Sequence, residues 1–216
     1  MLVEFWDFCR PNSLRTLPYV KAWHERYSPD GLRVIGVHCP GFEASREEQA
    51  VRDAVARLEV CHPVLIDSDF ELWRDYGNEG WPARYLFDGR ARLHDYHYGE
   101  GAYGETELAI QELVGVEREP LAPLRPEDAP AARLAPQTED QPGPYSGPYE
   151  AGGVWAVLDG TGVVTVDAGA GARRISVSHP GAYPLLEHDR HTAGLLELAI
   201  GPGVRCLATC FTPGLA

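Results

Sequence analysis

The chain has 216 residues, of which 44% are hydrophobic and 10% aromatic, a composition typical of folded globular proteins. Acidic residues outnumber basic ones by 32 to 19, and the net charge of −13 disfavours nucleic acid or anionic lipid as partners. It contains no apolar run of about 18 residues, which a membrane-spanning helix needs, and no signal-peptide pattern. We therefore expect a cytoplasmic chain of one large or two small domains.

Five cysteines are spread along the chain, at positions 9, 39, 61, 206 and 210. An odd number at such wide spacing does not match the disulfide framework of a small secreted domain. Cys206 and Cys210 are four residues apart in one expected strand. We therefore expect them on the same face of that strand and too far apart to bond.

The first 118 residues alternate between strand and helix patterns. Short apolar runs rich in β-branched or aromatic residues predict strands, and stretches with apolar residues along one side predict helices. This alternation predicts an α/β sheet with helices on both faces, ending in a hairpin and a last helix. The expected strands are 2–8, 31–39, 61–67, 84–88 and 92–99, and the expected helices are 12–27, 46–59, 70–77 and 105–115.

A proline-rich stretch follows. Residues 119–150 contain eight prolines and few large apolar side chains, which favours extended, solvated backbone. We predict a linker here, between a domain at 1–118 and a domain at 151–216. The alternative is an ordered strap that packs against both domains.

The last part of the chain has a different pattern. Six short apolar runs at about ten-residue spacing, separated by Gly, Pro or Asp turns, predict a small β-sandwich or jelly roll. With about 70 residues this module has little interior of its own, so we expect it to pack on the first domain or on a second chain in a homodimer. The runs are 153–158, 162–167, 173–178, 182–187, 194–200 and 204–212.

The segment FWDFCRPNSLRTLPYVKAW at 5–23 resembles the redox motif of the thioredoxin fold, in which a strand ending in Phe-Trp leads to Cys-x-x-Cys at a helix start. That segment and GLRVIGVHCPGF, WRDYGNEGWPARYLFD and YGEGAYGETE are similar to the TlpA-like, DipZ-type subgroup. The resemblance covers residues 2 to about 115. It implies a thioredoxin-like domain with protein or peptide thiols and disulfides as partners, and with no cofactor or metal.

This chain departs from the family at the two positions that carry the chemistry. In the family the first cysteine follows the Trp by four positions, and a proline follows the second cysteine by five. Counted from Trp6 and Pro18, this spacing puts Arg10 at the position of the attacking cysteine and Ser13 at that of the resolving cysteine. Neither can carry out thiol–disulfide exchange, which needs one thiolate to attack and a second to release the mixed disulfide.

Cys9 is the remaining thiol of the motif. In a register shifted by one residue, residues 9–12 would mimic Cys-Gly-Pro-Cys with Asn12 in place of the resolving cysteine. In either register Cys9 lies just before a helix N-terminus and beside Arg10, which would stabilise a Cys9 thiolate, whereas the alternative is that Cys9 is a buried small apolar residue. Cys39 ends the second expected strand, and because adjacent parallel strands end side by side, it is a candidate disulfide partner for Cys9.

Trp81-Pro82 matches the cis-proline of the family, which lies opposite the motif and presents backbone to an extended substrate. The resemblance thus implies Trp6, Trp81 and Pro82 as substrate-binding residues. The C-terminal module is similar to the β-rich module of DipZ-type proteins, which resembles carbohydrate-binding jelly rolls. Its aromatic residues Tyr149, Trp155 and Tyr183 would line a sugar-stacking face or belong to the core.

Two functions remain open. In the first, the chain is a thioredoxin-family protein with a degenerate site and at most monothiol activity on disulfides or peroxides through Cys9, with Cys39 or a small external thiol as the resolving group. In the second, it is redox-silent and holds an extended peptide or a sugar-like ligand with the Pro82 groove and the β module.

Overall fold

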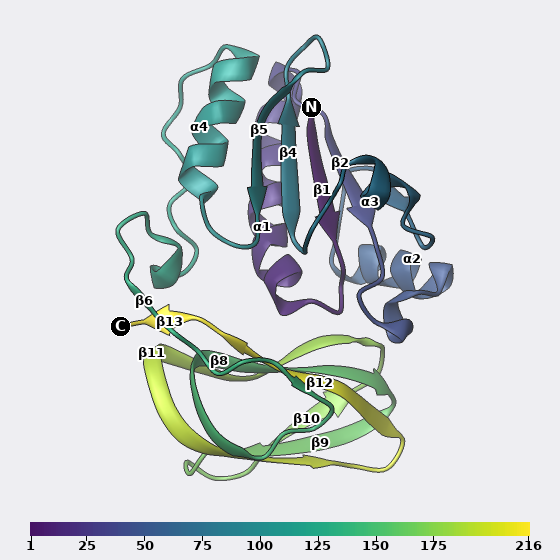
Figure 1. Cartoon of the computed structure of the whole chain (residues 1–216), viewed down its shortest axis with the longest axis vertical. Helices are drawn as coiled ribbons and strands as arrows, with labels where there is room; N and C mark the ends of the chain where they lie inside the picture. The colour runs from purple at the N-terminus through teal and green to yellow at the C-terminus, as the bar shows by residue number, and fades with distance from the viewer. The chain divides into compact units, whose positions relative to one another are not determined.

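The computed structural model describes all of residues 1–216, which divide into an N-terminal unit, Met1–Leu124, and a C-terminal unit, Arg125–Ala216. The N-terminal unit is built on a five-stranded sheet in the order β3-β2-β1-β4-β5 (Figure 1). β1 runs parallel to β2, β2 runs parallel to β3, and β4 and β5 are antiparallel additions on the other side of β1. The strands are β1 Leu2–Trp6, β2 Val34–His38, β3 Val64–Ile66, β4 Ala83–Phe87 and β5 Leu93–Tyr98.

Helices cover both faces of this sheet, as predicted. One face packs side chains such as Leu2 and Leu86 against α1 and α4. The opposite face packs Phe5 and Tyr85 against α3 and the segment around it. All five residues of β1 are buried because the strand is central and covered on both faces, which explains why all of them except Glu4 are apolar. The helices of this unit are α1 Pro11–Tyr27, α2 Glu48–Arg57, α3 Glu71–Asp75 and α4 Tyr103–Val114, and η1 Ser28–Asp30 and η2 Glu43–Ser45 are single 3-10 turns. A third 3-10 turn, η3 Pro126–Asp128, belongs to the C-terminal unit. None of these helices combines the length and the apolarity that a membrane span requires.

Hydrogen bonds and strand pairing hold the proline-rich stretch 119–150 at both of its ends. In the N-terminal unit, the Leu121 N–H donates to Glu107 Oε2 at 2.8 Å and the Leu124 N–H donates to the Tyr19 hydroxyl at 2.7 Å. The C-terminal unit takes up β6 Leu134–Ala135, β7 Gln141–Pro142 and the start of β8 at Gly147. Much of the stretch therefore has hydrogen-bonded partners within one unit or the other.

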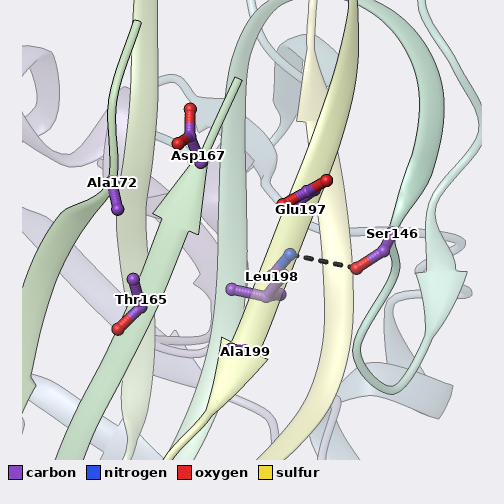
Figure 2. Close-up of a pocket in the computed structure, with 7 residues that line it drawn as sticks. All are labelled: Ser146, Thr165, Asp167, Ala172, Glu197, Leu198 and Ala199. Carbon is purple, nitrogen blue, oxygen red and sulfur yellow. Dashed lines mark hydrogen bonds between the residues drawn. The ribbon is translucent and has the colours of Figure 1, made fainter. Parts of the chain in front are cut away.

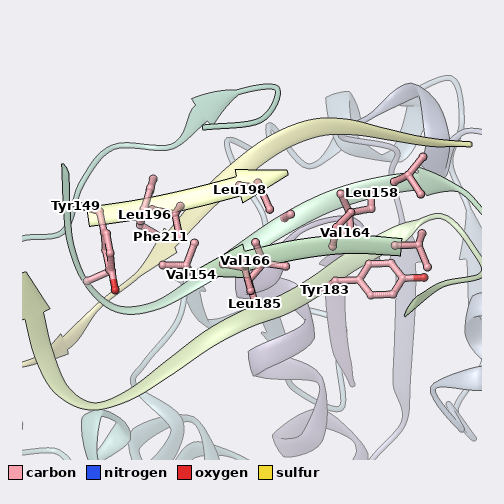
Figure 3. Close-up of a cluster of buried hydrophobic side chains, with 14 residues drawn as sticks. Tyr149, Val154, Leu158, Val164, Val166, Tyr183, Leu185, Leu196, Leu198 and Phe211 are labelled. Atoms are coloured by element: carbon pink, nitrogen blue, oxygen red, sulfur yellow. The ribbon is translucent and has the colours of Figure 1, made fainter. Parts of the chain in front are cut away.

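The C-terminal unit is all β. Its main sheet has the strand order β10-β9-β11-β8-β12-β7, and a small second sheet pairs β13 with β6. The strands contribute one apolar core, which includes Leu158, Val166, Leu185 and Phe211 (Figure 3). The remaining strands are β8 Gly147–Gly160, β9 Gly162–Asp167, β10 Arg173–Val177, β11 Gly181–Ile200, β12 Val204–Thr212 and β13 Gly214–Leu215.

Two irregularities in this unit differ from the sequence-based expectation. The runs 182–187 and 194–200 are parts of the single strand β11, whose register shifts between Glu187 and Thr192 where a turn was expected. In β12 the register shifts between Cys206 and Ala208. Because a β-bulge adds one residue, it reverses the alternation of side chains beyond it. Cys206 packs against the core cluster and Cys210 does not, so the prediction that both face the same side was wrong.

Candidate functional site

Arg10 lies at the junction between β1 and α1. It directly precedes the helix, with extended backbone (φ −104°, ψ 116°). Its half-exposed side chain places the guanidinium carbon 4.7 Å from the ring centroid of Phe42 and 4.7 Å from that of Trp81. Each cation–π contact of this kind contributes ~0.5–1 kcal/mol where it is partly exposed. We call Asp7, Arg10, Phe42 and Trp81 together the Arg10 site.

The carboxylate of Asp7 holds the loops around Arg10 together. It is fully buried, its Oδ1 accepts a hydrogen bond from the Cys9 N–H at 2.9 Å, and its Oδ2 accepts one from the Gly41 N–H at 2.8 Å. His38 Nε2 lies 3.4 Å from Asp7 Oδ1. One side chain thus links the end of β1 to the loop that follows β2.

Gly41 keeps open the space that Arg10 fills. A Cβ atom at Gly41 would lie 2.6 Å from Arg10 Nε and 2.9 Å from Asp7 Oδ2. Both separations are shorter than real Cβ contacts, so any larger residue here displaces one of these side chains.

Ser13 has a structural contact at the position of the missing resolving cysteine. Its side chain is fully buried in the first turn of α1, and its Oγ accepts a hydrogen bond from the Asp7 N–H at 3.2 Å. The hydroxyl therefore satisfies a backbone donor that would otherwise lie buried and unpaired.

The two cysteines near the site have no exposed surface. Cys39 donates its thiol hydrogen to Asp67 Oδ2, with an Sγ–O distance of 3.4 Å. Burial and the neighbouring Asp67 carboxylate raise the pKa of Cys39 far above its ordinary value, so this thiol stays protonated at neutral pH. No disulfide joins any of the five cysteines in the structure, and Cys9 and Cys39 are not bonded to each other. A buried thiol meets a polypeptide disulfide only after local opening of the fold.

Of the three predicted substrate-binding residues, Trp81 lies partly at the surface, whereas Pro82 and Trp6 are buried. The Trp81–Pro82 peptide bond is cis, and Trp81 is half-exposed. The Trp81 indole Nε1 donates to the Cys39 carbonyl oxygen at 3.0 Å, which fixes its ring beside Arg10. Pro82 is buried at the start of β4, and Trp6 has no exposed surface and forms part of the interior.

Three residues of this region were missed by the sequence analysis: Asp7, Phe42 and Asp67. Asp7 carries a usable signal, because a carboxylate directly after a buried central strand lies at the carboxyl edge of the sheet. Phe42 carries no such signal, since it lies in a loop and meets Arg10 only through the folding of β2 beside β1.

The C-terminal unit has a shallow hollow of about 450 Å³ over β9 and β11 (Figure 2). Polar and apolar side chains both line it, and Ser146 Oγ in it accepts a hydrogen bond from the Leu198 N–H at 3.0 Å. No aromatic side chain lines it, so it offers no stacking platform for a sugar ring. Tyr149 and Tyr183 belong to the apolar core, and Trp155 is half-buried outside that cluster. No group of three His, Cys, Asp or Glu side chains in the structure is arranged to hold a metal ion.

Comparison with known proteins yields sequence relatives for about half to two thirds of the chain, while no family model matches it. Protein DipZ of Mycobacterium bovis is 33% identical over 144 residues, which cover 64% of this chain and 21% of that protein. The thiol-disulfide oxidoreductase YkuV of Bacillus subtilis is 29% identical over 113 residues, 52% of this chain and 76% of that protein. Among solved structures, a putative thiol:disulfide interchange protein DsbE from Chlorobium tepidum is 19% identical with a TM-score of 0.49, over 53% of this chain and 79% of that one. The chain thus spans about a fifth of the length of its DipZ relatives.

Proposed function

We propose that the N-terminal unit, a thioredoxin-like domain related in sequence to thiol-disulfide oxidoreductases, receives protein thiol or disulfide substrates at the Arg10 site without performing dithiol exchange. The observation that carries this proposal is the position of Arg10. A guanidinium, in place of a thiol, lies at the start of α1 beside Trp81.

Dithiol exchange lacks both of its reactants here. The nucleophile must be a thiolate that can reach the substrate sulfur, and a second thiol must release the mixed disulfide. Cys9 is buried, and Cys39 is buried, protonated and hydrogen-bonded to Asp67. Any residual chemistry at the Arg10 site is therefore a monothiol reaction of Cys9 in a locally opened form.

The assay is the reduction of insulin by dithiothreitol, with the wild type beside Cys9→Ala. We expect both proteins to run at the rate of dithiothreitol alone, or the wild type to show a slow excess that Cys9→Ala removes. An excess that survives in Cys9→Ala contradicts the assignment of Cys9 as the only remaining thiol of the site. A fast wild-type turnover contradicts the loss of dithiol exchange.

A second candidate function, binding without chemistry, rests on the partly exposed guanidinium of Arg10. Its Nε is buried without a hydrogen-bond partner, and its guanidinium carbon lies 4.7 Å from the ring centroids of Phe42 and Trp81. A guanidinium of this kind can accept a carboxylate where the sulfur of a family substrate would lie.

Carboxymethylated and carbamidomethylated insulin B chain are matched ligands for this test, because the first carries a carboxylate on each cysteine and the second a neutral amide. We expect the carboxymethylated chain to bind more tightly to the wild type and the difference to vanish in Arg10→Gln. Equal binding of the two chains to the wild type contradicts this second function.

A further inference from the structure

A separate cavity of about 480 Å³ lies beside the second half of α1, at the segment that connects α2 to β3. It is remote from the Arg10 site in the topology of the sheet. Arg10 follows the carboxyl end of β1, whereas this segment leads into the amino end of β3, which runs parallel to β1 through β2. The lining residues that matter are Lys21, His24, Glu25, Glu59, Cys61 and His62.

Cys61 is the exposed thiol of this protein. Cys9, Cys39 and Cys210 are buried, and Cys206 is intermediate. The Cys61 thiol donates a weak hydrogen bond to the Glu59 carbonyl oxygen, with an Sγ–O distance of 3.6 Å. The thiol that solvent species reach in the folded chain is therefore the one at the rim of this cavity.

His62 adds an independent sign of a ligand. Its side chain is 3% exposed, and neither ring nitrogen has a hydrogen-bond partner. The ring of His24 lies edge-on with its centroid 5.7 Å away, and its Nδ1 is also buried without a partner. Buried polar groups in folded proteins are nearly always paired, so these unpaired nitrogens in the wall of the cavity favour a polar ligand. Because the nitrogens have almost no accessible surface, a ligand hydrogen-bonds to them only when the side chains that line the cavity shift on binding.

The charges around the cavity indicate the kind of molecule. Burial, together with His24 and Lys21, lowers the pKa of His62 to about 4, so at neutral pH its ring has one donor and one acceptor nitrogen. The Lys21 ammonium donates one hydrogen bond to the Leu58 carbonyl oxygen at 2.7 Å and has two further N–H donors. Glu25 and Glu59 bring carboxylates. A site with an ammonium, carboxylates and the neutral imidazole of His62 is complementary to an amino-acid-like, zwitterionic group.

We propose that this cavity binds low-molecular-weight thiols and disulfides with amino-acid-like tails, and that Cys61 forms a mixed disulfide with them. The thiolate of Cys61 attacks one sulfur of the small disulfide RS–SR. The S–S bond of the small molecule breaks, a bond forms between Cys61 Sγ and one RS group, and the other leaves as a thiolate that takes up the proton lost by Cys61. The small disulfide is the oxidant, and no other reactant is needed.

The test compares two disulfides with each other, in the folded protein and in denaturant. Glutathione disulfide carries zwitterionic tails, and bis(2-hydroxyethyl) disulfide carries neutral ones. Peptide mass mapping after acid quenching gives the rate of mixed-disulfide formation at Cys61 for each. The ratio of the two rates in denaturant is the intrinsic preference of the thiol, and a change of that ratio on folding measures recognition by the cavity.

We expect folding to raise the preference for glutathione disulfide about tenfold, which corresponds to ~1.4 kcal/mol of selective binding. This gain in the preference for glutathione disulfide should be smaller in Lys21→Met and should be retained in Lys21→Arg. In Cys61→Ser, reduced glutathione should still shift the ring-proton NMR signals of His24 and His62. An unchanged ratio on folding, or no mixed disulfide at Cys61, overturns the proposal. This proposal does not depend on the function of the Arg10 site.

Discussion

The side chains of Arg10 and Trp81 come together from distant parts of the chain, with the guanidinium carbon 4.7 Å from the indole centroid. Trp81 is itself fixed by its hydrogen bond to the Cys39 carbonyl oxygen. At the start of α1 in this thioredoxin-like domain, aromatic contacts therefore hold the guanidinium of Arg10 in place.

Loss of the Arg10 side chain should cost a modest amount of stability. Arg10→Ala removes two cation–π contacts at a half-exposed site, so we expect a loss of ~1–2 kcal/mol in the free energy of unfolding. Arg10→Lys keeps the charge and should lose less. Urea denaturation followed by tryptophan fluorescence measures both, and an Arg10→Ala protein as stable as the wild type would show that the contacts contribute nothing.

Gly41→Ala should displace Arg10 from its aromatic neighbours. The added Cβ would lie 2.6 Å from Arg10 Nε, and the flexible arginine gives way more easily than the buried Asp7 carboxylate. We expect an altered emission of Trp81 and a loss of ~1 kcal/mol in stability. Gly80→Ala is the matched control, because a Cβ there meets nothing within 4 Å. Equal effects of the two substitutions would refute the steric argument.

The buried Glu4 should give the domain a distinctive pH dependence. Burial raises the pKa of Glu4 to about 8, against the opposing charge of Arg84. Because the folded-state pKa lies above the unfolded one, Glu4 stabilises the fold fully below about pH 4.5, and this contribution is lost as the pH rises from about 4.5 to 8.

Substitution of Glu4 by Gln removes this titration. Wild type minus Glu4→Gln should therefore show a free energy of unfolding that falls by up to about 1.4 kcal/mol per pH unit in that window. Denaturation curves at a series of pH values give this difference, in which the other titrating groups cancel. A difference that is flat with pH would show that Glu4 keeps its ordinary pKa in the fold.

Glu107 should be a strong determinant of stability in the N-terminal unit. Its buried carboxylate accepts hydrogen bonds from the Tyr27 hydroxyl at 2.6 Å and from the Leu121 N–H at 2.8 Å, and it pairs with Arg26 at 3.1 Å. Glu107→Ala leaves these donors without an acceptor, and we expect a loss of ~3 kcal/mol. Glu112→Ala, on an exposed side chain of the same helix, should change stability by less than about 0.5 kcal/mol. Thermal denaturation of both variants tests this, and similar melting temperatures would contradict it.

The elements that the sequence predicted well are those whose pattern is local. The buried run of β1, the amphipathic α1 and the alternating strands of the second unit each carry their signal within a few residues. The spacing from Trp6 and Pro18 also placed Arg10 and Ser13 at the start of α1, where the structure has them.

The features that the sequence could not give depend on contacts between distant residues. Residues 121 and 124 are ordered by Glu107 and Tyr19, which no composition argument about prolines reveals. The bulge in β12 reverses the side-chain alternation and separates Cys206 from Cys210, and it leaves no mark in the apolar pattern. The burial of Cys9 likewise depends on packing from other segments of the chain.

The most direct test of the central claim is to restore the missing cysteines. In Arg10→Cys/Ser13→Cys the chain carries Cys-x-x-Cys at the start of α1, and Arg10→Ala/Ser13→Ala is the matched control without the two introduced thiols. We expect the cysteine variant to gain dithiothreitol-dependent reduction of insulin, while the wild type and the alanine variant stay at the background rate. Insulin reduction by the wild type at the rate of the restored variant, or no gain in the restored variant when it is folded, would contradict the account.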